Sequence, residues 1–325
     1  MTTLYDLPLS ELSEYRPPLD EPADLDAFWA AALAEADELA LDPEFRPHST
    51  LLRTVEVFDA SFTGSGGQRV SAWLVLPRAR PARSPCVVQY LGYNLGRGLP
   101  HDFLTWSAFG YAHLVVDTRG QGGKSIPGST ADLMPAAPGP HVPGFLTLGI
   151  LDPEQYFYRR VYVDAVRAVA AAKAHPEIDA DRIVVTGGSQ GGGITLAAAA
   201  LAPGVAAAMP DVPFLCHFRR GAEIASDGPY RELVTWLAAH RHRAAEAFAT
   251  LRYFDNAVLS ARASAPALFS VALRDPVCPP STVFAAYNRY GGPGEIRVWE
   301  WNEHEGGQSA QVAEQAAWLA KTLTP

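Results

Sequence analysis

The chain has 325 residues, of which 48% are hydrophobic and 19% are charged, and its formal net charge is −9. This composition excludes a disordered chain, and the negative charge without any Lys/Arg cluster argues against a nucleic-acid partner. No apolar run approaches the length of a membrane span, and three scattered cysteines suit neither a disulfide framework nor a zinc site.

The first 50 residues are acidic, marked by prolines, and contain one amphipathic helical pattern over residues 24–39. They have neither a basic start nor an apolar secretory segment, so we expect a cytoplasmic protein with this extension packed on the main body. Strand patterns follow at residues 54–58 and 70–76. The glycine-rich stretch 64–67 between them predicts a hairpin.

From Cys86 onward, strand and helix patterns alternate. Strands are predicted at 86–90, 113–117, 183–186, 205–209, 268–272 and 296–301, and helices at 103–109, 156–174, 194–202, 281–290 and 308–323. This alternation indicates βαβ units and a mostly parallel sheet within one α/β domain spanning residues 1–325. Two longer segments, 125–153 and 217–253, are predicted insertions that act as lids or subunit contacts.

A glycine-flanked serine follows the strand pattern at 183–186, in the segment Gly187-Gly188-Ser189-Gln190-Gly191. Strand, sharp turn and helix with serine at the apex describe the nucleophile elbow of the α/β-hydrolase fold. The glycines let neighbouring segments approach while the serine adopts a strained backbone. We therefore predict that Ser189 is a nucleophile.

A nucleophilic serine needs a base and a group that orients the base, and in this fold the chain order is Ser, Asp or Glu, then His. Asp275 follows the predicted strand 268–272, and His304 is the only histidine after it. We assign Asp275 as the orienting acid and His304 as the base. Asp211 is the main rival for the acid, whereas Asp117 lies before the serine and is out of order.

Two backbone N–H groups are candidates for stabilising an oxyanion. One belongs to Gln190, the residue after the nucleophile, and the other to Tyr93, in the loop after strand 86–90. A metal site at Glu303-His304-Glu305 is not predicted, because adjacent side chains point apart and no H-E-x-x-H spacing exists.

The segment Asp117-Thr118-Arg119-Gly120-Gln121-Gly122 follows another predicted strand. A phosphate-binding loop is the alternative interpretation, but the Walker spacing and lysine are missing. We predict that Arg119 supports neighbouring loops through bidentate hydrogen bonds. Cys278, three residues after Asp275, is predicted to be a small packing residue near the site.

Taken together, these motifs resemble the acetyl xylan esterase and cephalosporin C deacetylase family, carbohydrate esterase family 7. The likeness rests on Arg119-Gly120-Gln121, on the elbow and on His304-Glu305. It extends to residues 211–220 and 275–282 and to the opening residues 6–9 and 15–18, and so covers essentially the whole chain.

The resemblance implies a triad of Ser189, Asp275 and His304, with Tyr93 and Gln190 as oxyanion donors and no cofactor. It also implies removal of acetyl groups from small substrates such as acetylated xylo-oligosaccharides and cephalosporin C. Members of the family are typically intracellular hexamers. Two alternatives are a serine peptidase of the prolyl-oligopeptidase type, whose propeller domain the short extension cannot form, and a non-catalytic binding protein of the same fold.

Overall fold

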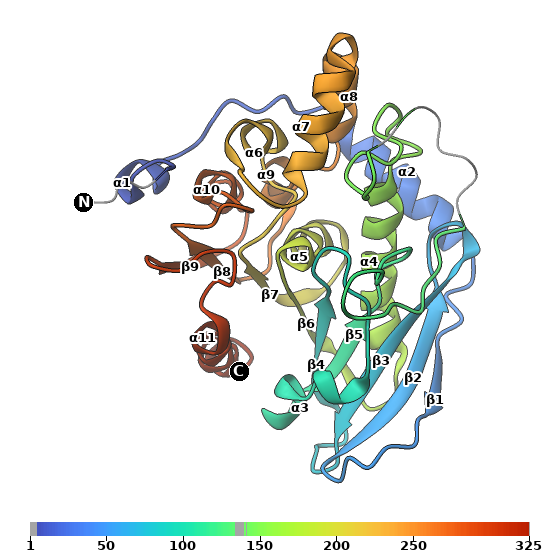
Figure 1. Ribbon diagram of the computed structural model, residues 1–325. Helices are drawn as coiled ribbons and strands as arrows, with labels where there is room; N and C mark the ends of the chain where they lie inside the picture. Colours follow the sequence, from blue (N-terminus) through green and yellow to red (C-terminus); the bar gives the residue numbers. More distant parts are fainter. Residues whose placement is uncertain (1–4, 134–139, 141, 325) are drawn as a thin grey trace.

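The computed structural model describes residues 5–133, 140 and 142–324 (Figure 1). The described strands form one nine-stranded sheet in the order β1-β2-β3-β5-β4-β6-β7-β8-β9. The strands are β1 (Glu44–Pro47), β2 (Val55–Thr63), β3 (Arg69–Pro77), β4 (Ser84–Tyr90), β5 (Ala112–Val116), β6 (Ile178–Gly188), β7 (Val205–Asp211), β8 (Ala267–Ala272) and β9 (Gly294–Trp299).

The sheet has an antiparallel and a parallel part. Strands β1, β2, β3 and β5 pair antiparallel in turn, whereas β5, β4, β6, β7, β8 and β9 run parallel. The hairpin predicted around residues 64–67 is confirmed, because β2 and β3 pair along their full length on either side of a short turn, Ser65–Gly67. The mostly parallel sheet and its flanking helices confirm the predicted α/β-hydrolase fold.

Helices cover both faces of the sheet (Figure 1). They are α1 (Leu9–Leu12), α2 (Leu25–Asp37), α3 (Thr105–Ala108), α4 (Phe157–Ala174), α5 (Gln190–Leu201), α6 (Phe218–Ile224), α7 (Tyr230–Ala239), α8 (Ala244–Leu251), α9 (Asn256–Leu259), α10 (Pro280–Tyr287) and α11 (Gln308–Thr322). Helices α4 and α5 pack on one face, and α3 and α11 lie against the other.

The central strands bury both of their faces, as parallel strands between helices do. Val88 and Val185 join the large core beneath α4 and α5. Their neighbours Val87 and Val184 point the other way, into a smaller core with Trp318 of α11. This double burial explains the apolar runs at residues 86–88 of β4 and 183–185 of β6.

The elements differ from the sequence prediction in three ways. Helix α5 begins at Gln190 rather than at residue 194, because the glycines after the serine already turn helically. The segment 217–253 is divided into α6, α7 and α8. Between α6 and α7 the chain turns at Gly228, which has a φ of 71° and is followed by Pro229. Strand β1 and the short helices α1 and α9 were not predicted.

Parts of two predicted segments lie outside the described residues, namely 1–4 of the extension and 134–139 and 141 of the 125–153 insertion. Within the described ranges, no helix combines the length and the apolar character that crossing a membrane requires.

Candidate active site

Ser189 stands at a strained turn between β6 and α5. Its φ of 57° and ψ of −119° lie where a non-glycine residue persists only if its surroundings enforce it. Those surroundings are hydrogen bonds from Ser189 N to Asp211 O (3.0 Å) and from Phe214 N to Ser189 O (2.9 Å). The elbow is thus anchored to the end of β7 and the loop that follows it.

Glycine is required on both sides of this turn by the close approach of β4. A Cβ at Gly191 would lie 2.2 Å from the Tyr90 carbonyl oxygen, and a Cβ at Gly187 would lie 2.6 Å from the same atom. No other residue fits at such distances. The glycine spacing in the sequence therefore reflects direct backbone contact with the neighbouring strand.

Asp275, His304 and Ser189 form a continuous hydrogen-bonded relay. His304 Nδ1 lies 2.9 Å from Asp275 Oδ2, and His304 Nε2 lies 2.9 Å from Ser189 Oγ. The three residues follow β8, β9 and β6, and the carboxyl ends of parallel strands meet at one edge of a sheet. The structure therefore brings together the three residues that were assigned from their order in the sequence.

The buried carboxylate fixes the tautomer of the imidazole. Asp275 is fully buried, and its Oδ1 accepts the N–H groups of Val277 (2.8 Å) and Cys278 (2.9 Å). Because an ionised carboxylate only accepts, His304 must donate Nδ1–H to it. Its Nε2 then carries a lone pair toward the Ser189 hydroxyl, which is the arrangement that a general base needs.

Asp211, the rival acid, does not contact His304 through a hydrogen bond but still lines the same cavity. Its carboxylate accepts the Ser270 hydroxyl, and Ser270 Oγ in turn accepts Val212 N–H (3.1 Å). Burial raises the pKa of Asp211 to about 6. Sequence order alone did not separate the two acids, and the structure gives the contact with the base to Asp275.

The two expected oxyanion donors lie at the same edge of the sheet, Tyr93 after β4 and Gln190 at the start of α5. Within the described part of the chain, neither backbone N–H donates to a protein acceptor. Neither N–H is therefore committed to an acceptor among the described residues, so each is available to another oxygen atom. That availability is what oxyanion stabilisation requires.

A pair of buried glutamines joins the segments that carry the two expected oxyanion donors. The Gln190 and Gln121 side-chain amides hydrogen bond to each other in both directions, at 2.8 and 3.0 Å. Gln190 Nε2 also donates to Leu91 O (3.2 Å), and Gln121 Oε1 accepts Asn94 N–H (2.6 Å). Gln121 thus links its own motif to the loop around Tyr93, a contact that the sequence analysis missed.

The serine and the histidine open onto a cavity of about 320 Å³. Its apolar wall is formed by Leu91, Leu95, Phe103, Ile126 and Val212. Ile126 belongs to the 125–153 insertion, so that segment reaches the active-site cavity. A small apolar acyl group suits such a wall, with the polar side chains of Ser189 and His304 also lining the cavity.

The N-terminal extension also contacts Asp275. The Tyr5 hydroxyl donates to the backbone carbonyl of Asp275, and the Asp6 carboxylate accepts Ser281 N–H (2.8 Å) and pairs with Arg220 (3.0 Å). The extension therefore contacts the loop of Asp275, and nothing in the sequence pattern indicated this contact.

Among the described residues, the group that could hold a metal ion consists of Asp275, Cys278 and His304, whose ligand atoms lie within 4.8 Å of one another. His304 and Asp275 are already hydrogen bonded in the relay. Cys278 is fully buried beside them, as its position in the sequence predicted, and burial raises the pKa of its thiol. A neutral thiol here acts as a small packing group.

Arg119 makes a buried bidentate ion pair with Asp164 of α4. Arg119 Nε and Nη2 lie 2.6 and 2.7 Å from the two carboxylate oxygens, and the residues are 2% and 5% exposed. Arg119 Nη2 also donates to Ser65 O in the β2–β3 turn (3.2 Å). The guanidinium therefore ties three segments together.

We expect Arg119→Met to destabilise the protein by about 3–5 kcal/mol, because it leaves the Asp164 carboxylate buried without its cation. Urea unfolding measures this change. The matched control is Arg78→Met, which breaks the exposed pair with Glu56 and should cost no more than about 1 kcal/mol. Equal effects of the two substitutions would contradict a supporting role for Arg119.

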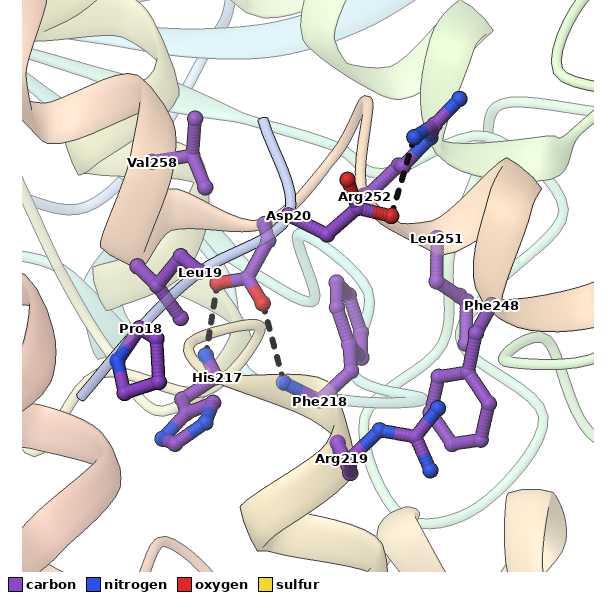
Figure 2. A pocket seen from close by; sticks show the side chains of 11 residues that line it. Pro18, Leu19, Asp20, His217, Phe218, Arg219, Phe248, Leu251, Arg252 and Val258 are labelled. Atoms are coloured by element: carbon purple, nitrogen blue, oxygen red, sulfur yellow. Dashed lines mark hydrogen bonds and ion pairs between the residues drawn. The ribbon is translucent and has the colours of Figure 1, made fainter. Parts of the chain in front are cut away.

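A second cavity, of about 160 Å³, lies where Pro18, Leu19 and Asp20 cross α6 and α8 (Figure 2). It shares no lining residue with the first cavity. Its buried acid, Asp255, accepts the backbone N–H groups of His217 (2.6 Å) and Phe218 (3.1 Å) and so caps α6. The carboxylate is therefore occupied in holding the fold, and the candidate active site remains the cavity at Ser189.

Comparison with known proteins gives similarities over the whole chain. The family model for acetyl xylan esterases matches residues 1–322. An acetyl xylan esterase from Paenibacillus sp. R4 has a TM-score of 0.91 at 38% identity, with 97% of this chain and 99% of that chain covered. Acetyl xylan esterase 1 from Thermoanaerobacterium sp. JW/SL YS485 has a TM-score of 0.88 at 31% identity, with 98% and 100% covered.

A curated relative, the acetyl esterase Axe7A of Xylanibacter ruminicola, is 25% identical over 317 residues, which are 95% of this chain and 69% of the relative. These similarities confirm the resemblance to the acetyl xylan esterase family that the sequence motifs indicated.

Proposed function

This chain belongs to the acetyl xylan esterase family, whose members are carboxylic ester hydrolases, and we propose that Ser189, His304 and Asp275 are its catalytic triad. The relay of two 2.9 Å hydrogen bonds in the wall of a small apolar cavity is the observation that carries the proposal. The Tyr93 and Gln190 backbone N–H groups are the proposed oxyanion donors.

The proposed reaction has two steps. Ser189 Oγ attacks the ester carbonyl as His304 Nε2 accepts its proton, and the two N–H groups bind the developing oxyanion. The tetrahedral intermediate collapses, the alkoxide takes the proton from His304 and leaves, and acetyl remains on Ser189. Water then gives a proton to His304 and attacks the acyl-enzyme, which releases acetate and restores the serine.

We further propose small acetylated alcohols as substrates, among them acetylated xylo-oligosaccharides and cephalosporin C. The family resemblance and the apolar wall of the cavity support this class. The same resemblance leads us to propose an intracellular hexamer, which light scattering tests through its mass.

An ester panel tests the substrate class. We expect kcat/KM for acetyl esters to exceed that for butyryl esters of the same alcohol by about tenfold or more, because added methylenes must fit a small cavity. Acetylated xylo-oligosaccharides, cephalosporin C and 4-nitrophenyl esters supply the alcohols, and a peptidyl anilide is the control. Faster cleavage of the anilide would favour a peptidase instead.

A further inference from the structure

The side chain of Tyr93 is held where the two insertions meet. Its hydroxyl oxygen accepts the backbone N–H of Phe145 (2.5 Å), in the 125–153 segment. The same hydroxyl lies 2.7 and 2.8 Å from the two carboxylate oxygens of Glu232, on α7 in the 217–253 segment. Because a hydroxyl has one hydrogen and a carboxylate only accepts, Tyr93 donates to Glu232.

The Glu232 carboxylate is partly buried by the surrounding structure. One of its oxygens also accepts the backbone N–H of Leu146 (3.1 Å). Burial raises the pKa of Glu232, while the hydrogen bond from Tyr93 favours the charged form. Charged acceptors make stronger hydrogen bonds than neutral ones, so this contact is a firm anchor for the tyrosine.

The backbone of the 125–153 segment is shaped to admit this carboxylate. Gly144 has a φ of 134°, and a Cβ at that position would lie 2.2 Å from the Glu232 carboxylate. One turn further along α7, the buried Trp236 donates its indole N–H to Pro140 O (2.8 Å). Helix α7 is therefore fastened to the insertion on both sides of the glycine.

The backbone next to Tyr93 is held by the hydrogen bond from Asn94 N–H to Gln121 Oε1 (2.6 Å), but Tyr93 itself is not part of a strand. It lies in a turn beyond the end of β4, so no strand ladder fixes the direction of its N–H. The ring makes edge contacts with Phe145 and Phe214, with centroids 5.6 and 6.3 Å apart. Such apolar contacts hold the ring in its pocket, whereas the hydrogen bonds of the hydroxyl fix how far the side chain extends.

We propose that Glu232 is a positioning residue that aims the Tyr93 N–H at the oxyanion, and that this is a catalytic use of both insertions. The inference rests on the proposed function, in which Tyr93 donates to the oxyanion. An oxyanion donor is effective only when it is already placed where the charge develops. Loss of the carboxylate frees the Tyr93 hydroxyl and leaves the Leu146 N–H unpaired.

A double-mutant cycle between Tyr93→Phe and Glu232→Ala tests the coupling. Tyr93→Phe keeps the ring and the backbone N–H and removes only the hydroxyl. We expect each variant to lower kcat for 4-nitrophenyl acetate by about tenfold with KM little changed, less than the roughly hundredfold loss of a whole oxyanion donor. The loss in the double variant should be well below the product of the two single losses, because both substitutions remove the same Tyr93–Glu232 hydrogen bond.

Inhibition by phenylboronic acid, which forms a tetrahedral adduct with an active-site serine, provides a readout that a merely structural role would not move. Its Ki should rise in parallel with the loss of kcat. Glu232→Gln, which keeps an acceptor, should recover part of the loss. Glu246→Ala is the matched control, since Glu246 lies on α8 of the same insertion and forms an ion pair with Arg243 at the surface.

Gly144→Ala should displace the Glu232 carboxylate while leaving the residue types at positions 93 and 232 unchanged. It replaces Glu232→Ala in the test if that variant does not fold. It should also lower kcat and weaken the boronate. Losses that multiply in the double variant, a change confined to KM, or unchanged boronate inhibition in folded variants would overturn the proposal. Failure of the proposed function gives a different result, in which Ser189→Ala keeps its activity and the boronate does not inhibit the parent.

Discussion

Ser189→Ala is expected to lower kcat for acetyl esters by about 10⁶-fold, because the members of a triad act as a unit. The attacking atom is lost, and His304 Nε2 no longer has a hydroxyl at 2.9 Å to deprotonate. The substitution keeps Cβ, so the strained backbone at φ 57° is unchanged and the fold should persist. Steady-state hydrolysis of 4-nitrophenyl acetate measures the loss, and an unchanged melting temperature confirms folding.

Ser309→Ala is the matched control, since Ser309 is an exposed serine on α11. A fluorophosphonate, which reacts quickly only with an activated serine, should label the parent and the control but not Ser189→Ala. If Ser189→Ala kept near-parental activity, the nucleophile would have to be another residue. If the fluorophosphonate did not label the parent, the alternative of a non-catalytic binding protein would be favoured.

Asp275→Asn is expected to lower kcat by about 10⁴-fold through the tautomer of His304. The amide oxygen of asparagine would take the place of Oδ1, which accepts N–H groups from Val277 and Cys278. Its NH₂ group would then face His304 Nδ1 and force that atom to accept. Nε2 would carry the hydrogen and could no longer remove the proton of Ser189.

Asp211→Asn provides the comparison, because this second acid lines the cavity without a hydrogen bond to the base. Its amide can still accept the Ser270 hydroxyl, so we expect a far smaller loss of kcat than in Asp275→Asn. The pH–rate profiles of both variants on the same acetyl ester separate the two roles. A larger loss in Asp211→Asn would reverse the assignment of the acid.

Much of the sheet could be predicted because its central strands are buried on both faces. Apolar runs such as residues 183–186 are stable only when both faces are buried, as in a central strand, and each run is bounded by turn residues. Strand β1 has no such pattern, since two of the four residues in Glu44-Phe45-Arg46-Pro47 are charged and the last is a proline. It is a strand only because β2 offers it an edge with which to pair.

The candidate triad could be assembled from chain order, because parallel strands present their carboxyl ends at one edge. Order could not separate Asp275 from Asp211, since both follow strands and only the fold decides which carboxylate faces His304. Glu232 could not be found at all. In a helical pattern a glutamate is normally a solvent-facing residue, and it is the contact of Pro140 and of residues 142–146 with α7 that buries it.

The position of His304 after β9 has a consequence for folding during synthesis. Strand β9 pairs with β8 alone at the edge of the sheet, and it is the last strand in the chain. In a nascent chain Tyr93, Ser189 and Asp275 are therefore synthesised before His304, and this proposed base reaches the site only when the final strand pairs with β8. Ester hydrolysis should thus appear late in synthesis, as a sign that the whole sheet has closed.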